Sequence, residues 1–294
     1  MKTGTLKLHP NSYHNTSYDF KSLAKNVPEL EKHLIKNPAG IDTVDFSNSN
    51  VVYLLNKALL LHFYNLNFWD LPKNNLIPPI PGRADYIHYM ADLLKADKIK
   101  TKPINILDIG TGASLIYPII GSSVYDWNFV AVDIDSKSID NGQLIIQKNE
   151  RLQNKINLRL QKNPKNILEG IILKNDYFEA VMCNPPFFKS AKEAVFQTNR
   201  KIKGLTKKAP IKTVNNFAGL QNELWCDGGE LVFVMNYIKD SILFKEQIAW
   251  FTCLISNEDN LKPCIKELKK IGSNCQVIEM SQGNKKSRIL AWRF

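Results

Sequence analysis

Short apolar runs alternate with helix-like segments from residue 104 onward, and this alternation is the strongest constraint on the fold. The runs are rich in Ile, Val and Phe and fall at residues 104–110, 129–135, 156–161, 178–183, 230–236 and 248–256. Segments with helix-spaced apolar residues lie between or after them, at 115–123, 136–152 and 261–272. Strands that are apolar throughout and separated by helices are typical of a parallel sheet covered on both faces. The pattern predicts an α/β fold with a doubly wound, mostly parallel sheet.

The two ends of the chain depart from this alternation. Two final apolar runs, at 276–282 and 288–294, flank the polar stretch GNKKS and predict an antiparallel hairpin at one sheet edge. The first hundred residues look mostly helical, with helix-spaced apolar residues at 28–36 and 49–65 and a further helix that begins near Ala84. We therefore divide the chain into a mostly helical N-terminal region, residues 1–95, and a sheet domain, residues 96–294.

Composition excludes several classes of protein and favours a polyanionic partner. No run of 18 apolar residues occurs and the start of the chain is polar, so we expect a cytoplasmic protein without membrane contact. The five cysteines are widely spaced and form no C-x-x-C pair, which argues for buried free thiols rather than disulfides or a zinc site. The formal charge is +11, and the segment from Lys189 to Lys212 has eight basic residues against one acidic residue. Such a run is usually a solvated surface, but it also suits a nucleic acid.

A glycine turn with the sequence DIGTG begins at Asp108, at the end of the first predicted strand. In a doubly wound sheet, ligands bind beyond the carboxyl ends of the strands, and Gly110 and Gly112 would let a ligand approach the backbone. Leu115 stands where a dinucleotide fingerprint has its third glycine, and Asp133 follows Gly112 by 21 residues, where a carboxylate can bind ribose hydroxyls. The pattern indicates a nucleoside ligand without a required diphosphate, such as S-adenosylmethionine. A tight turn with no ligand is the alternative interpretation.

A second motif, CNPPFF, follows the predicted strand at 178–183. Two prolines cannot continue a sheet, so a loop must begin at Asn184. The loop could be a plain turn whose phenylalanines enter the core, although the combination Asn-Pro-Pro-aromatic is rare by composition alone. Because the carboxyl ends of parallel strands share one edge, we expect this loop to face the same crevice as the glycine turn.

The residues of this loop suit methylation of the exocyclic amine of a base. That nitrogen is a poor nucleophile because its lone pair is drawn into the ring. The side-chain carbonyl of Asn184 and the main-chain carbonyl of Pro185 can each accept one of its hydrogens, which favours charge build-up on the nitrogen in the transition state. Pro186 stiffens the loop, and Phe187 offers a ring on which the base can stack. The target base must be unpaired or flipped to arrive there.

Seven blocks of the sequence resemble the bacterial 23S ribosomal RNA adenine-N6 methyltransferase family, whose wider relatives include a eukaryotic methyltransferase of spliceosomal small nuclear RNA. The blocks are LHPNSYHNTSYDF at 8–20, PAGIDTVDF at 38–46, PPIPGRADYIH at 78–88, ILDIGTGAS at 106–114, CNPPFF at 183–188, ELWCDGGE at 223–230 and SQGNKKSRILAW at 281–292. The first and last blocks are the most specific, because other amino-methyltransferases share the glycine turn and the proline loop.

The resemblance implies a seven-stranded, Rossmann-like domain that transfers a methyl group from S-adenosylmethionine to N6 of one adenine in large-subunit ribosomal RNA. By this resemblance the catalytic loop consists of Asn184, Pro185, Pro186 and Phe187. The implied cofactor-binding residues are Arg83, Asp108, Gly110, Gly112 and Asp133. Some relatives carry glutamate and polar residues where this chain has Asp133 to Asp135, a departure that still leaves a carboxylate for the ribose.

The resemblance also implies how RNA would be held. In the family, the basic stretch after the catalytic loop contacts or gates RNA, and in this chain it contains Arg200, Lys201, Lys203, Lys207 and Lys208. The N-terminal region, residues 1–95, would help to select the RNA. The expected partner is ribosomal RNA of the large subunit or an assembly intermediate, and we expect a monomer that needs no metal.

Two other functions are compatible with the same motifs. One is a non-catalytic RNA-binding protein that keeps a methyltransferase fold, and the other is an amino-methyltransferase that acts on DNA or on a protein glutamine. His9, His14 and His88 lie in the shared blocks but lack metal-ligand spacing, so we interpret them as structural or phosphate-contacting residues. Cys183, directly before Asn184, is expected to face the core rather than to act as a nucleophile.

Overall fold

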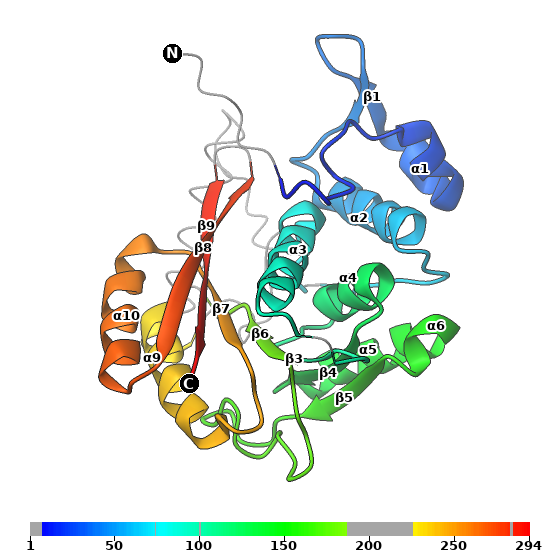
Figure 1. Ribbon diagram of the computed structural model, residues 1–294. Coiled ribbons are helices and arrows are strands. Elements are labelled where there is room, and N and C mark those ends of the chain that lie inside the picture. The colour runs from blue at the N-terminus through cyan, green and yellow to red at the C-terminus, as the bar shows by residue number, and fades with distance from the viewer. Residues whose placement is uncertain (1–7, 74, 100, 187–225, 283–284) are drawn as a thin grey trace, which may run out of the picture.

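The computed structural model describes residues 8–73, 75–99, 101–186, 226–282 and 285–294. Within these ranges, seven strands form one sheet in the order β5-β4-β3-β6-β7-β9-β8 (Figure 1). The strands are β3 (Asn105–Ile109), β4 (Asn128–Asp133), β5 (Ile156–Leu160), β6 (Ala180–Cys183), β7 (Phe251–Ile255), β8 (Asn274–Gln282) and β9 (Lys285–Arg293). The pairs from β5 to β7 are parallel, whereas β9 pairs antiparallel with both β7 and β8. The predicted mostly parallel sheet with a C-terminal hairpin is confirmed.

Alternate side chains of these strands enter two separate hydrophobic cores, one on each face of the sheet. Ile106 and Met182 belong to the core that packs against the helices preceding β6, whereas Leu107 and Cys183 belong to the core under the helices that follow it. The first set of helices is α3 (Ile80–Ala96), α4 (Ile116–Tyr125), α5 (Ser136–Gln147) and α6 (Glu150–Gln153), and the second is α9 (Gly229–Ser241) and α10 (Leu261–Lys270) (Figure 1). Burial on both faces explains why the central strands are apolar throughout.

The run ELVFVMN at 230–236 begins helix α9 rather than the strand predicted from its sequence. Glu230, Val234 and Tyr237 are buried along one side of the helix, at spacings of three and four residues. A short apolar run cannot be assigned to a strand or a helix by its periodicity alone, and here the helical spacing emerges only with the residues after 236. The prediction of a strand at this position is wrong.

The N-terminal region is mostly helical, as predicted, and includes one small hairpin. Its elements are α1 (Phe20–Asn26), the 3₁₀ helix η1 (Pro28–His33), β1 (Leu34–Lys36), β2 (Asp42–Val44), α2 (Ser49–Phe63) and α3. The segment at 28–36, predicted to be a helix, is helical only up to His33, because Leu34 then pairs with Val44 in the hairpin. Helix α2 begins after Asn48, whose side chain accepts the backbone N–H groups of Asn50 and Val51.

The N-terminal region and the sheet share one continuous hydrophobic core. Leu30, Leu60 and Tyr86 from this region are buried in the same cluster as Ile106 of β3. Trp69, which is completely buried, donates from its indole nitrogen to the backbone oxygen of Ser114 at 3.0 Å, close to the start of α4. The division of the chain at residue 95 stays a prediction, but the contacts across it are those of a single packed core.

The three conspicuous histidines have polar partners within the protein. His9 pairs with Asp92 at 2.9 Å, His14 with the Tyr64 hydroxyl at 2.8 Å, and His88 with a further hydroxyl. Burial lowers the pKa of both His14 and His88 to about 4. The described residues contain no group of His, Cys, Asp and Glu side chains that could hold a metal ion. These histidines therefore have structural roles, which agrees with one of the two interpretations of the sequence.

Two further expectations concern membranes and thiols. Among the described segments, none of the helices is both long enough and apolar enough to cross a membrane. All five cysteines are free thiols, and Cys183, Cys253 and Cys264 are buried. Cys183 lies in the core beneath α9 and α10, as expected.

Candidate active site at the carboxyl ends of the strands

A cavity of about 400 Å³ opens where β3, β4 and β6 end. Gly110 and Gly112 line it after β3, Asp133 at the end of β4, and Asn184 after β6. Arg83, from the first turn of α3, forms part of its wall. The structure thus brings the glycine turn and the proline loop to a single cavity. This cavity lies at the edge of the sheet where doubly wound folds bind ligands.

The glycine turn needs glycine for its backbone conformation rather than for space. Gly110 has φ of 71° and Gly112 has φ of 65°, in the left-handed region that other residues rarely adopt. A side chain at Gly110 would meet no atom within 4 Å, so the surroundings do not exclude one. The turn is fixed by two hydrogen bonds of 2.9 Å, from the N–H groups of Gly110 and Thr111 to the oxygen of Val132.

Asp133 joins the glycine turn to the end of β4. Its Oδ2 accepts the N–H of Gly112 at 2.8 Å, and its Oδ1 accepts the N–H of Asp135 at 2.9 Å. Burial raises the pKa of Asp133, while these backbone hydrogen bonds lower it. Each carboxylate oxygen can accept more than one hydrogen bond, so Asp133 retains capacity for hydroxyl donors in the cavity.

Asp108 is completely buried within β3 and does not line the cavity. Within the part of the chain that the structure describes, neither of its carboxylate oxygens has a hydrogen-bond partner. Burial raises the pKa of Asp108 to about 7, the Thr111 hydroxyl acts in the opposite direction, and the charges of Asp133 and Arg83 raise and lower it, respectively, by smaller amounts. A buried carboxylate without partners is costly in a folded protein and is a feature of functional sites.

Arg83 is 8% exposed and reaches the cavity from α3. Its Nη1 donates to the Tyr117 hydroxyl at 2.8 Å, and its guanidinium lies 5.5 Å from the centre of the Tyr117 ring. In the described ranges it forms no ion pair with a carboxylate, although it bears the only positive charge among the residues that line the cavity. A guanidinium held in this way presents its remaining N–H groups to an anionic ligand.

Asn184 and Pro186 line the cavity from the proline loop. The Oδ1 atom of Asn184 is buried, and no donor reaches it from any described residue. An amide oxygen in this position is an acceptor available to a ligand. Phe187 and the basic residues predicted to contact RNA, Arg200, Lys201, Lys203, Lys207 and Lys208, lie outside the described residues, as does Trp225 of the shared block ELWCDGGE.

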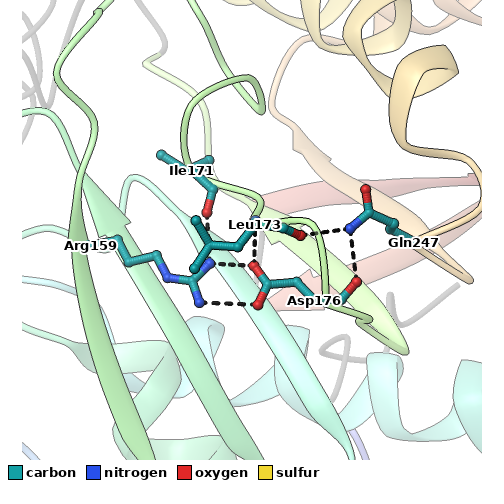
Figure 2. A network of polar contacts seen from close by, with 5 residues as sticks. All are labelled: Arg159, Ile171, Leu173, Asp176 and Gln247. Atoms are coloured by element: carbon teal, nitrogen blue, oxygen red, sulfur yellow. Dashed lines mark hydrogen bonds and ion pairs between the residues drawn. The ribbon is translucent and has the colours of Figure 1, made fainter.

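The loop between β5 and β6, residues 161–179, contributes to the cavity although no motif in its sequence predicted this. Figure 2 shows how the end of this loop near β6 is fixed. Arg159 of β5 donates to both carboxylate oxygens of Asp176 and to the backbone oxygen of Ile171. Gln247 donates to the backbone oxygens of Leu173 and Asp176. Such two-point pairing between guanidinium and carboxylate is geometrically specific. The polar network holds the loop against the sheet.

An apolar wall of the cavity is formed by this loop, β4 and α9. Ile167 from the loop, Ile134 after β4 and Phe233 of α9 all line it. Asp240 of α9 accepts the backbone N–H groups of Ile167 and the next residue at 3.1 and 3.4 Å, which ties the loop to the helix. Ile134 is 42% exposed and presents an apolar surface to the cavity.

Tyr86 is a residue near the site that sequence reasoning missed. It is completely buried, three positions after Arg83 in α3, and its hydroxyl lies 3.4 Å from both the backbone nitrogen and the backbone oxygen of Cys183. It is also 2.8 Å from the hydroxyl of Thr252. The spacing of Arg83 and Tyr86 places both on one side of the helix, but only the fold reveals that this side faces β6.

Comparison with known proteins agrees with this geometry. A family described as RNA methyltransferase matches residues 3–294. A protein of Psychrobacter sp. named "Ribosomal RNA large subunit methyltransferase F" is 47% identical over 100% of this chain and 94% of its own length. A protein of the same name from Bacteroides thetaiotaomicron is 47% identical over 98% of both chains.

Solved structures of human METTL16 are similar over nearly the whole chain. The catalytic domain "in complex with MAT2A 3'UTR hairpin 6" is 29% identical, with a TM-score of 0.81 and coverage of 98% of this chain and 97% of that one. The N-terminal domain of human METTL16 "in complex with SAH" is 26% identical, with a TM-score of 0.77 and coverage of 98% and 99%. Fold, cavity and full-length sequence similarity lead to one conclusion: this chain belongs to the RNA methyltransferase family.

Proposed function

We propose that this protein transfers a methyl group from S-adenosylmethionine to N6 of an adenine in large-subunit ribosomal RNA. The observation that carries the proposal is the buried Oδ1 of Asn184, which lacks a donor among the described residues and belongs to a residue that lines the same cavity as the glycine turn. The relatives named "Ribosomal RNA large subunit methyltransferase F", at 47% identity, support ribosomal RNA as the substrate. This reaction takes place in the cytoplasm, and the enzyme works as a monomer without a metal.

The residues around the cavity fit S-adenosylmethionine, and the human METTL16 domain solved with SAH supports this cofactor. Arg83 is the positive group for the carboxylate of its methionine part, and Asp133 accepts the ribose hydroxyls. The backbone at Gly110 and Gly112 allows the cofactor to approach closely. The exposed Ile134 covers one face of the adenine ring. Asp108 does not line the cavity, so its ionised form acts on the positively charged cofactor through its charge.

The catalytic loop supplies acceptors for the target amine. When bound, S-adenosylmethionine supplies an electrophilic methyl group on a sulfonium. The Asn184 side chain and the Pro185 carbonyl each accept one hydrogen of the amine, which raises electron density on its nitrogen as the new bond forms. The two prolines have no N–H to compete for these carbonyls. Phe187 stacks on the adenine, and the proton leaves after transfer, so a strong general base is unnecessary.

RNA is held by two parts of the chain in this proposal. The basic residues after the catalytic loop, Arg200, Lys201, Lys203, Lys207 and Lys208, contact phosphates. The N-terminal region, residues 1–95, selects the RNA around a target adenine that is unpaired or flipped. The METTL16 catalytic domains solved with RNA hairpins support a role of this fold in RNA binding, because they cover 98% of this chain.

The test is mass spectrometry of nucleosides from ribosomal RNA of cells that lack the protein. We expect one N6-methyladenosine to disappear, to return with the wild-type chain, and to stay absent with Asn184→Ala. Asn236→Ala, which changes an exposed asparagine of α9, is the matched control and should restore the modification. An unchanged modification profile in the deletion strain would refute the proposal. Methyl transfer from labelled cofactor to DNA or to protein glutamine instead of RNA would favour the alternative substrates.

A further inference from the structure

The hydroxyl of Tyr86 occupies a position between β6 and β7 that backbone pairing would otherwise fill. Val181 of β6 donates its N–H to the oxygen of Trp250 at 2.8 Å, and it pairs in parallel register with Phe251. Continued pairing in this register would place Cys183 opposite Cys253. On its other side, β6 stays paired with β3 as far as Cys183, whereas the described register with β7 contains only the pair at Val181.

The peptide groups of Cys183 that face β7 are the groups that contact Tyr86. Along a strand, residues two apart direct their N–H and C=O groups to the same side. Since Val181 directs its N–H to β7, Cys183 does so as well, and both its N–H and its C=O lie 3.4 Å from the Tyr86 hydroxyl. A side chain from the N-terminal region thus replaces a backbone partner at the last residue before Asn184.

The hydroxyl groups in this place can be arranged so that every donor has an acceptor. The Thr252 hydroxyl lies 2.8 Å from the oxygen of Val181, to which it donates its single proton. The Tyr86 hydroxyl then donates to Thr252 Oγ1 at 2.8 Å and accepts the N–H of Cys183. This chain of hydrogen bonds links α3, β6 and β7, and all its members are buried.

We propose that Tyr86 is a positioning residue that fixes the end of β6 and thereby the direction of the catalytic loop. This inference rests on the proposed function, because it assigns Tyr86 to the loop that binds the target amine. The ring of Tyr86 packs edge-on against Tyr117 with centroids 5.4 Å apart, and Tyr117 in turn accepts the hydrogen bond from Arg83. One helix therefore supports both the cofactor side of the cavity, through Arg83, and the substrate side, through Tyr86.

The test is Tyr86→Phe, which keeps the ring and removes only the hydroxyl. We expect kcat for RNA methylation to fall about tenfold or more, because small displacements of a reacting group have large effects on rate. The Kd for S-adenosylmethionine and the KM for RNA should stay within about twofold, since the residues at the cofactor are untouched. Hydrogen exchange of the peptide that contains the Cys183 amide should become faster, and this measurement needs no activity.

Two kinds of matched control separate positioning from general stability. Tyr125→Phe removes the hydroxyl of a partly buried tyrosine at the end of α4, which lies 2.8 Å from Nδ1 of His88 and, among the described residues, makes no hydrogen bond to β6 or β7, so it should leave kcat unchanged. Thr252→Ser keeps the hydroxyl and should behave as wild type, whereas Thr252→Val should reduce kcat. Combining Thr252→Val with Tyr86→Phe should reduce kcat little beyond either change alone, because both break one chain of hydrogen bonds.

Two results would overturn the role of Tyr86. One is a wild-type kcat in Tyr86→Phe with unchanged exchange at Cys183. The other is a loss of activity that equals the loss of cofactor-binding stoichiometry, which would mean that only the folded fraction had changed. Should the wild-type chain methylate no RNA at all, the proposed function fails, while exchange at Cys183 still decides whether Tyr86 holds the end of β6.

Discussion

The carboxylate of Asp133 accepts a hydrogen bond of 2.8 Å from the backbone N–H of Gly112, so the acid that ends β4 also fixes the glycine turn that follows β3. One side chain therefore defines two sides of the cavity. A carboxylate placed for ribose recognition would also set the conformation of the backbone that approaches the cofactor. Experiment can separate the two contributions, because an asparagine in place of Asp133 still has a side-chain oxygen that can accept the Gly112 N–H.

Asp133→Ala should raise the Kd for S-adenosylmethionine about 10-fold to 100-fold, because it removes the ribose acceptor and leaves the Gly112 N–H unpaired. Asp133→Asn should have a smaller effect, since its one side-chain oxygen can still accept from Gly112. Isothermal titration calorimetry measures both values. Asp140→Ala, at an exposed position of α5, is the control and should bind as wild type does. Equal affinities for Asp133→Ala and the control would contradict a role in the cofactor site.

Arg83→Ala should raise the Kd for S-adenosylmethionine about 10-fold to 100-fold, the usual effect of losing a charge-assisted hydrogen bond. It should leave the affinity for 5′-methylthioadenosine nearly unchanged, because that nucleoside lacks the methionine carboxylate. Asp133→Ala should weaken the binding of both ligands, since both contain the ribose. A binding experiment with two ligands and two variants thus assigns each residue to one end of the cofactor. A parallel loss for both ligands in Arg83→Ala would mean that Arg83 acts only through the packing of Tyr117.

Acid should weaken the attachment of the N-terminal region through His14 and His88. Burial lowers the pKa of each to about 4 from an ordinary value of 6.5. Between these two pH values the folded state therefore binds fewer protons than the unfolded state. Their contribution to stability is complete above pH 6.5 and is lost as the pH falls toward 4. The melting temperature should fall over this window, and replacing both residues with Gln should flatten that fall.

Titration of Asp85 should change the stability in the opposite direction, over an overlapping pH range. Burial raises its pKa from 3.8 to about 6, so its contribution to stability is complete below pH 3.8 and is lost as the pH rises to about 6. Asp85→Asn removes this opposing contribution while an oxygen still accepts the backbone N–H of His9. The acid-side fall in melting temperature should therefore be steeper in this variant. A slope equal to that of the wild type would show that Asp85 does not titrate in the folded protein.

The lysine run after the catalytic loop should determine the salt dependence of RNA binding. Replacing Lys201, Lys203, Lys207 and Lys208 with alanine should lower the slope of log Kd against log salt by about 3, while cofactor affinity stays the same. The control changes four exposed lysines of α10, namely Lys262, Lys266, Lys269 and Lys270, and alters net charge equally. Identical slopes in the two quadruple variants would mean that only net charge matters and that the run has no direct contact with RNA.

The sheet and the glycine turn could be predicted because each depends on local sequence. Central strands buried on both faces produce uninterrupted apolar runs, and a turn with positive φ at Gly110 requires glycine whatever the surroundings. Helix α9 could not be predicted from ELVFVMN, because seven apolar-rich residues fit a buried strand as well as a helix. The small hairpin after His33 was missed for a similar reason, since its pairing partner lies beyond the segment whose pattern looks helical.

The sequence predicted those residues of the candidate site that directly follow the ends of strands. It did not predict those contributed by elements distant in the sequence. Asn184 and Asp133 could be placed at the cavity by the rule for parallel sheets. Tyr86 contacts Cys183 across 97 positions of sequence, and no local pattern encodes such a contact. Asp108 was assigned to the cofactor by the family resemblance, yet its side chain is completely buried and does not line the cavity. Its environment depends on the packing of α3 and α4 above it, which only the fold provides.

Helix α3 carries Arg83, which lines the cavity, and Tyr86, which contacts the end of β6, and it is synthesised before any strand of the large sheet. An attempt to graft a new RNA-recognition module onto this enzyme should therefore join the two parts before residue 80, so that α3 remains with its own sheet. A junction placed at residue 95 instead would import a foreign α3, and the hybrid would lose the side chains that complete the cavity.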